Sequence, residues 1–445
     1  MELRDVIVTP IILFTVYALA YLVRPWVTDD VNRSYFIPAL TVRIFGALAV
    51  GFVYQFYYDG GDTFAYHTHG SRPLWEAIIR SPLDGIGLLF ANGEYGPGIW
   101  DTANRIWYWN DPQAFFVIRV AAVLDIFTFS SYSATAVLFA VIAFTGAWLL
   151  FVTFYKMYPR LHRWIAFSVF FIPTVVFWGS GIFKDTLTLA ALGISTYAFH
   201  RVFIERRAQL SFILLMLLCL WLIFSIKKYI LLCFLPAVML WWVATYLSRI
   251  SSLMLRLIIT PLTAIVAIML AYYAVLMVGE DDPRYHISNL AETARITAYD
   301  IRYGWGARTG EGSGYTLAGL DGSWQSMVAL APQAISVSLF RPYLWEVRNP
   351  LMMLSALEGL LFLGLSLLVV LRVRWNLFVY LRQRDVLFCF VFAIVFAFAV
   401  GVSTFNFGTL SRYKIPMMPY YMLGIGIITA YWKRERKLVE FESTE

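Results

Sequence analysis

Charged residues are scarce in this chain of 445 amino acids. Asp, Glu, Lys and Arg together make up 14% of the sequence, whereas a soluble domain of average composition carries about 25%. Hydrophobic residues account for 60%, and no linker rich in Ser, Pro or Gly divides the chain. These features predict a single all-α domain, residues 1–445, embedded in a membrane. The net charge of +7 then reflects topology and not nucleic-acid binding, because the basic residues lie between apolar runs.

Cysteine is also rare. The three cysteines, Cys219, Cys233 and Cys389, all lie within apolar runs. They have none of the spacings typical of zinc sites, and they do not form the pattern of a disulfide-stabilised domain. They are therefore expected to behave as small buried hydrophobic side chains.

Long apolar runs are abundant. A run of about 20 residues can cross roughly 30 Å of hydrocarbon, and a helix satisfies its own backbone there. The pattern predicts about eleven spanning helices, at 6–23, 36–57, 132–155, 164–182, 185–203, 210–225, 229–248, 257–278, 351–371, 386–403 and 409–431. The first run lacks a small-residue cleavage site, so we expect a retained helix and not a signal peptide.

The basic residues predict which side of the membrane each connection occupies. More than half of the 35 Lys and Arg residues fall in six short segments, 24–35, 156–163, 201–209, 249–256, 372–385 and the tail from 432. By the positive-inside rule these segments are cytoplasmic, which places the N-terminus outside and the C-terminus inside. Two long loops, 58–131 and 279–350, then lie outside, and loops of this length are usually functional.

Residues 114–130, within the first of these loops, are apolar enough to be considered as a twelfth span. They contain Arg119 and Asp125, and charges are costly in a spanning segment. This favours a helix lying in the membrane interface. If the segment spanned instead, the beginning of the loop would move to the cytoplasm.

The first outside loop begins with the sequence YYDGGDTFAYHTHG, residues 57–70. Asp59 and Asp62 flank two glycines, which permit a tight turn at the end of the preceding helix. A carboxylate at this level can act as a general base on a hydroxyl whose reaction partner is anchored in lipid. The structural alternative is that Asp62 caps the next helix.

Other polar residues could contact a substrate. His67 and His69 could join the two aspartates around a divalent metal, but alternate residues of a helix point to different faces, so no cofactor is predicted. The aromatic side chains of the loop can stack on sugars or anchor helices at the headgroup level. The candidate substrate-binding residues are Tyr66, His67, His69, Glu94, Asp101, Arg105, Asp185 and Trp345.

Several cationic residues lie near the outer ends of predicted spans, although the positive-inside rule favours the cytoplasmic side for such residues. An ionisable residue at such depth indicates a functional site, and phosphate groups are its expected partners. The candidate phosphate-binding residues are Lys184, Lys227, Lys228, Arg341, Arg412 and Lys414. The structural alternatives are a locally neutralised turn at 184–185, contacts with lipid headgroups, and side chains that extend from helix ends towards water.

The acidic motif in the first outside loop, the interfacial helices after it and the late stretch RYKIPMMP together resemble the integral-membrane glycosyltransferases of the GT-C superfamily. The resemblance implies a helical enzyme that uses a sugar linked to polyprenyl phosphate. It also implies that Asp59 or Asp62 is the catalytic base and that Arg412 and Lys414 bind the lipid phosphate. The chain has two predicted helices before the acidic loop, where the family usually has one. The stretches GGDT, SGIFKDTL and RPYLWE also look like uncharacterised membrane proteins of bacterial surface-polysaccharide loci.

The resulting hypothesis is a glycosyltransferase of the bacterial inner membrane whose active site faces the periplasm. It would move a sugar from polyprenyl phosphate to a glycan or lipid-linked acceptor, with Asp62, or less favourably Asp59, as base. Two alternatives stay open. One is an O-antigen-type polymerase or ligase that uses polyprenyl diphosphate, and the other is a flippase or transporter of lipid-linked glycans.

Overall fold

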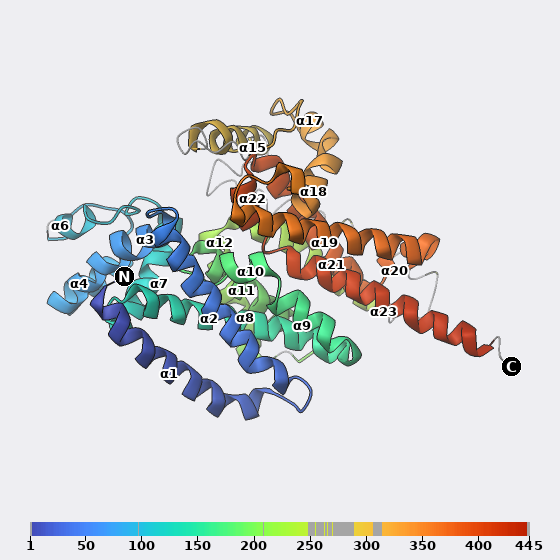
Figure 1. Ribbon diagram of the computed structural model, residues 1–445, viewed down its shortest axis with the longest axis horizontal. Helices are drawn as coiled ribbons and strands as arrows, with labels where there is room; N and C mark the ends of the chain where they lie inside the picture. Colours follow the sequence, from blue (N-terminus) through green and yellow to red (C-terminus); the bar gives the residue numbers. More distant parts are fainter. Residues whose placement is uncertain are drawn as a thin grey trace.

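The computed structural model describes residues 2–96, 98–207, 209–247, 254, 262, 265, 269, 289–305 and 314–442. Every regular element among them is helical, as the sequence predicts. Figure 1 shows an elongated arrangement, with the N-terminal helices gathered at one end and the C-terminal helix projecting from the other. The predicted span 257–278 lies almost entirely outside the described residues.

Seven helical segments among the described residues are long and apolar enough to cross a membrane, which confirms the prediction of a polytopic membrane protein. They are α1 (Leu3–Val27), α2 (Arg33–Phe56), α8 (Tyr132–Met157), α11 (Lys184–Phe199) with its π-helical end to Ile204, α13 (Lys228–Leu247), α19 (Pro350–Val373) with α20 (Leu377–Leu381), and α21 (Arg384–Ser403). Each matches one predicted span. The predicted span 210–225 forms α12 (Leu210–Ile226), which is apolar but only 17 residues long.

Two predicted spans are interrupted in the structure, whereas the sequence pattern predicted one helix for each. Residues 164–182 form α9 (His162–Phe170) and α10 (Pro173–Trp178), and residues 409–431 form α22 (Phe407–Tyr413) and the beginning of α23 (Met418–Glu442). Proline explains where the helices stop, because it has no backbone N–H and its ring clashes with the preceding turn. Pro173 begins α10, and Pro416 lies between α22 and α23.

The interruption between α9 and α10 is satisfied by buried charged side chains. Arg43 of α2 donates hydrogen bonds to the carbonyls of Val175 (2.8 Å), Gly179 (3.2 Å) and Val169 (3.3 Å). On the N-terminal side of α10, Glu358 of α19 accepts hydrogen bonds from the backbone N–H and the hydroxyl of Thr174 at 3.0 and 2.7 Å. At the break itself, the carbonyl of Val169 and the N–H of Thr174 thereby gain partners in an apolar interior.

The predicted outside loops contain shorter helices. The first holds α3 (Asp62–Tyr66), α4 (Arg72–Arg80), α5 (Pro82–Phe90), α6 (Trp100–Ala103) and α7 (Pro112–Thr128), and the described part of the second holds α15 (Leu290–Tyr299), α17 (Trp324–Ala329) and α18 (Ala331–Phe340). The segment predicted as an interfacial helix is therefore helical, as α7. Figure 1 shows α3–α7 beside the upper end of α2.

The central helix pair is α8 and α11, which pack closely because small residues face each other. A Cβ added at Gly146 would lie 2.3 Å from the Cα of Ala190, and one added at Gly193 would lie 2.3 Å from the carbonyl oxygen of Gly146. Contacts between small residues let helix backbones approach closely in a membrane. This packing fixes α11, whose first residues, Lys184 and Asp185, belong to the site described below.

Candidate functional site

Arg412 joins residues from the beginning, the middle and the end of the chain. Its Nη1 atom donates to Asp62 Oδ2 at 2.6 Å, and its Nε atom donates to Asp185 Oδ2 at 2.7 Å. Asp62 is the first residue of α3, Asp185 lies in the first turn of α11, and Arg412 lies near the end of α22. The guanidinium fork suits this geometry, because a planar group with several donors can hold two carboxylates at once.

A second cation completes the buried part of this cluster. Lys227 forms an ion pair with Asp185 Oδ1, and its ammonium lies 4.7 Å from the centre of the Tyr413 ring. Arg412 in turn lies 4.3 Å from the centre of the Phe183 ring. The Asp185 side chain is only 1% exposed, so its charge depends on these two cations. We call Asp62, Asp185, Lys227 and Arg412 the charge cluster.

Lys184 connects the charge cluster to α7. Its Nζ atom donates to Asp111 Oδ2 at 3.3 Å, while Asp111 Oδ1 accepts hydrogen bonds from Gln113 N at 2.9 Å and Ala114 N at 3.0 Å. Asp111 is thus the N-cap of α7 as well as the partner of Lys184. Four elements, α3, α7, α11 and α22, are held together by these charges.

Exposure distinguishes the members of the cluster. The Asp62 side chain is 43% exposed, whereas that of Arg412 is 13% exposed. Asp62 is therefore the carboxylate that an incoming molecule can reach, and Arg412 holds it in place from below. Among the described residues, the hydrogen bonds of Arg412 to carboxylates use Nε and Nη1, so the two N–H groups of Nη2 can donate to a ligand.

Two tyrosines border Asp62. Tyr66 is buried in α3, and its ring centre lies 5.3 Å from that of Tyr108. Burial raises the pKa of Tyr66 well above its usual value, and burial together with the Asp62 carboxylate raises the pKa of Tyr108 to about 12. Both phenols stay protonated at neutral pH, and Tyr108, which is partly exposed, can donate a hydrogen bond to an anion or a sugar oxygen.

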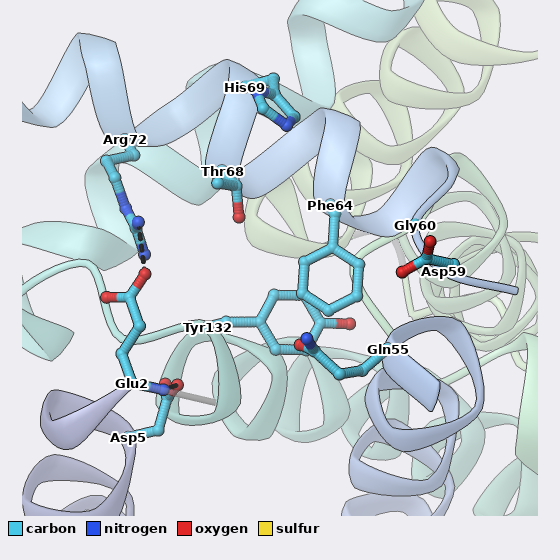
Figure 2. Close-up of a pocket in the computed structure, with 10 residues that line it drawn as sticks. All are labelled: Glu2, Asp5, Gln55, Asp59, Gly60, Phe64, Thr68, His69, Arg72 and Tyr132. Carbon is cyan, nitrogen blue, oxygen red and sulfur yellow. Dashed lines mark hydrogen bonds and ion pairs between the residues drawn. The ribbon is translucent and has the colours of Figure 1, made fainter. Parts of the chain in front are cut away.

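The turn before α3 separates the two predicted acids. Asp59, Gly60 and Gly61 all have positive φ, at 52°, 121° and 120°. Beyond this turn Asp62 joins the charge cluster, whereas Asp59 lines a different space, a cavity of about 330 Å³ shown in Figure 2. This polar cavity is lined by Glu2, Asp5, Gln55, Asp59, Gly60, Phe64, Thr68, His69, Arg72 and Tyr132.

The two histidines occupy different environments. His69 lines the polar cavity and stacks on Trp107 with ring centres 4.0 Å apart. Burial and the nearby Arg72 charge lower the pKa of His69, so its ring is neutral at pH 7. His67 is fully buried, with Nε2 3.4 Å from Asp125 Oδ1. Among the described residues, no group of three or more His, Cys, Asp or Glu side chains is arranged to hold a metal.

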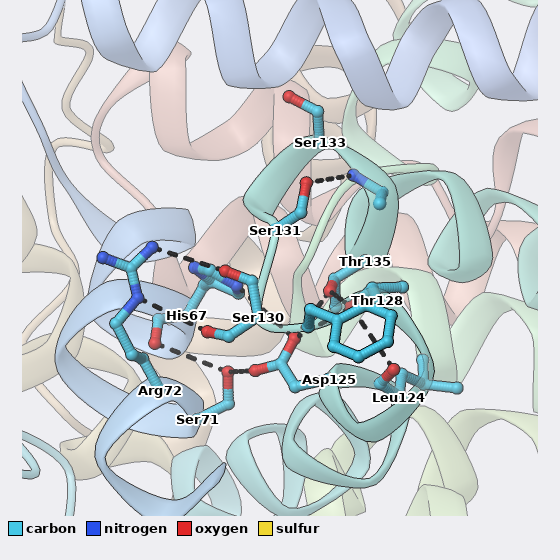
Figure 3. A network of polar contacts seen from close by, with 12 residues as sticks. His67, Ser71, Arg72, Leu124, Asp125, Thr128, Ser130, Ser131, Ser133 and Thr135 are labelled. Carbon is cyan, nitrogen blue, oxygen red and sulfur yellow. Dashed lines mark hydrogen bonds and ion pairs between the residues drawn. The ribbon is translucent and has the colours of Figure 1, made fainter. Parts of the chain in front are cut away.

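Asp125 is the centre of a buried polar network, shown in Figure 3. Its carboxylate accepts hydrogen bonds from Ser71 Oγ and Thr135 Oγ1, both at 2.6 Å, and from Thr128 Oγ1 at 3.4 Å. These contacts tie α7 to the beginning of α4 and of α8. His67 was predicted to bind substrate. In the structure its side chain is instead fully enclosed by protein, next to the contacts that join α7 to α4 and α8.

Two other predicted phosphate-binding residues form a neighbouring group. Lys414 is 1% exposed, and its Nζ atom lies 3.4 Å from the carbonyl oxygen of Arg341. Glu358 supplies a negative charge near Lys414, and Arg341 is paired with Glu346, with its Nε atom 3.0 Å from Oε2. Each cation therefore has an acid close by.

The remaining candidates do not join the charge cluster. Glu94, Asp101 and Arg105 lie on the peripheral segment around α6 (Figure 1), where Arg105 pairs with Glu76 at 2.6 Å. Lys228 begins α13 and lies 4.9 Å from the centre of the Phe224 ring. Trp345 is exposed and stacks on Tyr343. Among the described residues, no hydrogen bond or ion pair joins Glu94, Asp101, Arg105 or Trp345 to Asp62, Asp185 or Arg412.

Comparison with known proteins gives no relative from which a function could be transferred. No protein-family model, no curated protein and no solved structure matches the chain. The function has to be argued from the site itself.

The structure adds residues that the sequence analysis did not select. Asp111, Tyr108 and Phe183 surround the charge cluster, and Glu358 and Arg43 satisfy the interrupted helix. A signal existed for the last two, because each is an isolated charge inside a predicted span. For Asp111 the signal was its position before Pro112, a common pattern at the beginning of a helix.

Proposed function

We propose that the protein is a membrane glycosyltransferase that moves a sugar from a polyprenyl-phosphate carrier to a glycan or lipid-linked acceptor. The observation that carries this proposal is the charge cluster, in which one reachable carboxylate, Asp62, adjoins buried cations. A base and a phosphate-binding group are the two functions that this transfer requires at one place. The resemblance of the sequence to the GT-C superfamily supports the same reaction.

In the proposed reaction the acceptor hydroxyl oxygen forms a bond to the anomeric carbon of the donor sugar. The bond from that carbon to the phosphate oxygen breaks, and polyprenyl phosphate leaves with the electron pair. Asp62 takes the proton of the hydroxyl. Arg412, through its Nη2 N–H groups, and Lys184 stabilise the negative charge that grows on the phosphate. Asp185 and Lys227 hold Arg412 in position. No metal is required in this scheme.

We also propose the finer topology that the sequence predicts. The seven segments identified above would be part of about eleven spans in a bacterial inner membrane. The N-terminus and the loops that carry Asp62 and Trp345 would face the periplasm, and the C-terminus would face the cytoplasm. The charge cluster would then lie at the outer ends of α2 and α11, at the level of lipid phosphates.

The test is a transfer assay with purified protein in liposomes. A panel of polyprenyl-monophosphate and polyprenyl-diphosphate sugars is supplied together with bacterial lipid and glycan acceptors, and the release of the free carrier is measured. We expect release from monophosphate donors that depends on an acceptor. Release from diphosphate donors alone would favour a polymerase or ligase, and no release from any donor in the panel would contradict the proposal.

A second function, transport of a lipid-linked glycan, is favoured by one observation. The two interrupted helix pairs, α9–α10 and α22–α23, are accompanied by the buried ions Glu358 and Lys414. Interrupted helices with ionisable groups at the break are typical of transporters. Movement of an intact lipid-linked glycan across the liposome membrane, without any covalent product, would establish this function in place of transfer.

A further inference from the structure

A second cavity adjoins the polar cavity and extends into the region of the spanning helices. It has a volume of about 720 Å³ and lies between α1, α2 and the beginning of α8. We call it the apolar groove. Its lining is mostly hydrophobic and consists of Asp5, Val6, Thr9, Pro10, Phe45, Leu48, Ala49, Gly51, Phe52, Val53, Gln55, Phe64, Tyr132 and Ser133.

The groove exists because α1 is packed along only one narrow stripe. Its buried residues are Asp5, Thr9, Val16 and Ala20, which lie on one face of the helix. Most of its other large side chains are exposed, and Figure 1 shows α1 at the edge of the molecule. Tyr132 closes the floor of the groove, because its ring packs against Gly51, where an added Cβ would lie 2.5 Å from the ring.

The apolar groove and the polar cavity are continuous. Four residues, Asp5, Gln55, Phe64 and Tyr132, line both of them. Together they form a space that is apolar along two candidate membrane spans and polar at the ends of those spans. This is the shape of an amphiphile, and both volumes lie in the range of about 300–1,000 Å³ that is usual for small-molecule sites.

The polar cavity carries an excess of negative charge. Three carboxylates line it, those of Glu2, Asp5 and Asp59, whereas Arg72 is the one cation among the described lining residues. Arg4, outside the lining, also pairs with Glu2 at 2.8 Å, so three negative charges face two positive ones. Arg72 already pairs with Glu2 at 2.6 Å, as the dashed line in Figure 2 shows. Asp59 is exposed and has no hydrogen-bond or ion-pair partner among the described residues. The cavity therefore suits a cationic group and disfavours an anionic headgroup.

We propose that the apolar groove and the polar cavity together bind one membrane phospholipid whose headgroup carries an amino group, such as phosphatidylethanolamine. A hydrocarbon chain of the lipid lies in the groove between α1 and α2, and the ammonium group of the lipid headgroup lies against Asp59. The site is distinct from the charge cluster, because the Gly60–Gly61 turn separates Asp59 from Asp62. It does not depend on the proposed glycosyl transfer.

The test uses photo-crosslinking in liposomes that contain no sugar donor. The purified protein is reconstituted with a trace of phosphatidylethanolamine or phosphatidylglycerol that carries a photoreactive group in the acyl chain. Crosslinked peptides from α1 and α2 are then quantified. We expect phosphatidylethanolamine to be preferred by about fivefold, which is the selectivity that one exposed ion pair can supply. Equal crosslinking of the two lipids would overturn the proposal, because it would mean that bulk lipid fills the groove.

Three variants assign the parts of the site. Val6→Trp should fill the groove and reduce crosslinking of α1 and α2. Phe14→Trp, at another exposed position of α1 that lies outside the groove, should leave the crosslinking unchanged. Asp59→Asn should keep the crosslinking but remove the preference for phosphatidylethanolamine. Ala49→Phe is a second way to fill the groove if Val6→Trp does not fold.

Two results with these variants would contradict the proposal. One is an equal loss of crosslinking in Val6→Trp and Phe14→Trp. The other is an unchanged lipid preference in Asp59→Asn. Because lipid binding is measured directly and without a sugar donor, its outcome is independent of whether the protein transfers sugar.

Discussion

At the scale of residues, the arrangement around Arg412 depends on unequal exposure. One of its two carboxylate partners, Asp185, is enclosed and also paired with Lys227, and the other, Asp62, reaches solvent. Removing one partner of a buried pair leaves an uncompensated charge, whereas an exposed partner can be solvated. Arg412 therefore stabilises a buried carboxylate, Asp185, on one side and contacts a reachable carboxylate, the proposed base Asp62, on the other.

This asymmetry predicts a large effect of Arg412 on stability. Arg412→Ala should lower the free energy of unfolding by about 3–5 kcal/mol, because Asp185 loses a buried partner. The matched control Arg105→Ala, which breaks a pair with the partly exposed Glu76, should cost less than about 1 kcal/mol. Both variants can be purified in a mild detergent and titrated with a denaturing detergent. The resulting unfolding curves give the two free energies of unfolding. Equal losses of unfolding free energy in the two variants would contradict the buried ion pair between Arg412 and Asp185.

The sequence identified several members of this cluster but not their partners. Lys227 and Arg412 were selected because ionisable residues at the ends of membrane spans are costly and therefore indicate a function. Asp62 was selected because a carboxylate at the membrane surface can act as a general base. The pairing of each acid with a cation depends on how α3, α11 and α22 pack. The local sequence pattern does not reveal that packing. For the same reason Asp185 was selected as a substrate contact, although it is the buried centre of the cluster.

At the scale of elements, the turn between α2 and α3 determines where the two acids point. Gly61 has φ 120° and ψ −165°, a backbone conformation that is essentially restricted to glycine, and Gly60 has a similar φ. An added Cβ at Gly61 would also lie 2.8 Å from the Tyr54 ring, whereas one at Gly60 would meet nothing within 4 Å.

Alanine substitutions in this turn should therefore have graded effects. Gly60→Ala should destabilise the protein by about 1–3 kcal/mol through backbone strain alone, and Gly61→Ala by more, because Tyr54 must also move. Gly87→Ala, inside α5 and with no neighbour within 4 Å, should be neutral or slightly stabilising. Thermal unfolding in detergent gives the order of the three variants. A neutral Gly60→Ala would contradict the strained turn.

The interrupted helices are elements that hydropathy could not resolve. Apolar runs at 164–182 and 409–431 look continuous on an average scale, and the prolines within them were the local sign of a break. The sequence could not show that Arg43 and Glu358 satisfy the freed backbone groups of α9 and α10, because these residues lie on other helices.

Glu358 should be important for the interruption before α10. Glu358→Ala leaves the backbone N–H of Thr174 without an acceptor and its hydroxyl with only the weak acceptor Met418 Sδ at 3.3 Å, which should cost about 1–3 kcal/mol. Glu358→Gln keeps one acceptor oxygen at the same place and should cost less. The free energies of unfolding of the two variants measure this difference. Equal free energies of unfolding would mean that the Glu358 carboxylate does not accept hydrogen bonds from Thr174 at the beginning of α10.

At the scale of the whole molecule, the sequence predicted the class of fold well. The all-α architecture and seven of the predicted spans agree with the structure, because the length and composition of an apolar run largely determine a spanning helix. The sidedness of the molecule stays a prediction that rests on the distribution of basic residues.

Cysteine labelling tests this sidedness. In a variant whose three buried cysteines are replaced by alanine, Leu83→Cys in α5 and Trp375→Cys after α19 each create a single exposed thiol. A membrane-impermeant maleimide should label position 83 in intact spheroplasts, and position 375 only after lysis. The reverse pattern would place the charge cluster at the cytoplasmic face and overturn the proposed topology.

The most direct test of the central claim compares Asp62→Asn with Asp84→Asn in the transfer assay, using a donor that the wild-type protein accepts. Asparagine keeps an acceptor for Arg412 but cannot take a proton. If Asp62 is the base, Asp62→Asn should reduce the rate about 10²–10⁴-fold. Asp84→Asn, which changes an exposed carboxylate of α5, should retain the wild-type rate. Transfer by Asp62→Asn at the wild-type rate would contradict the account.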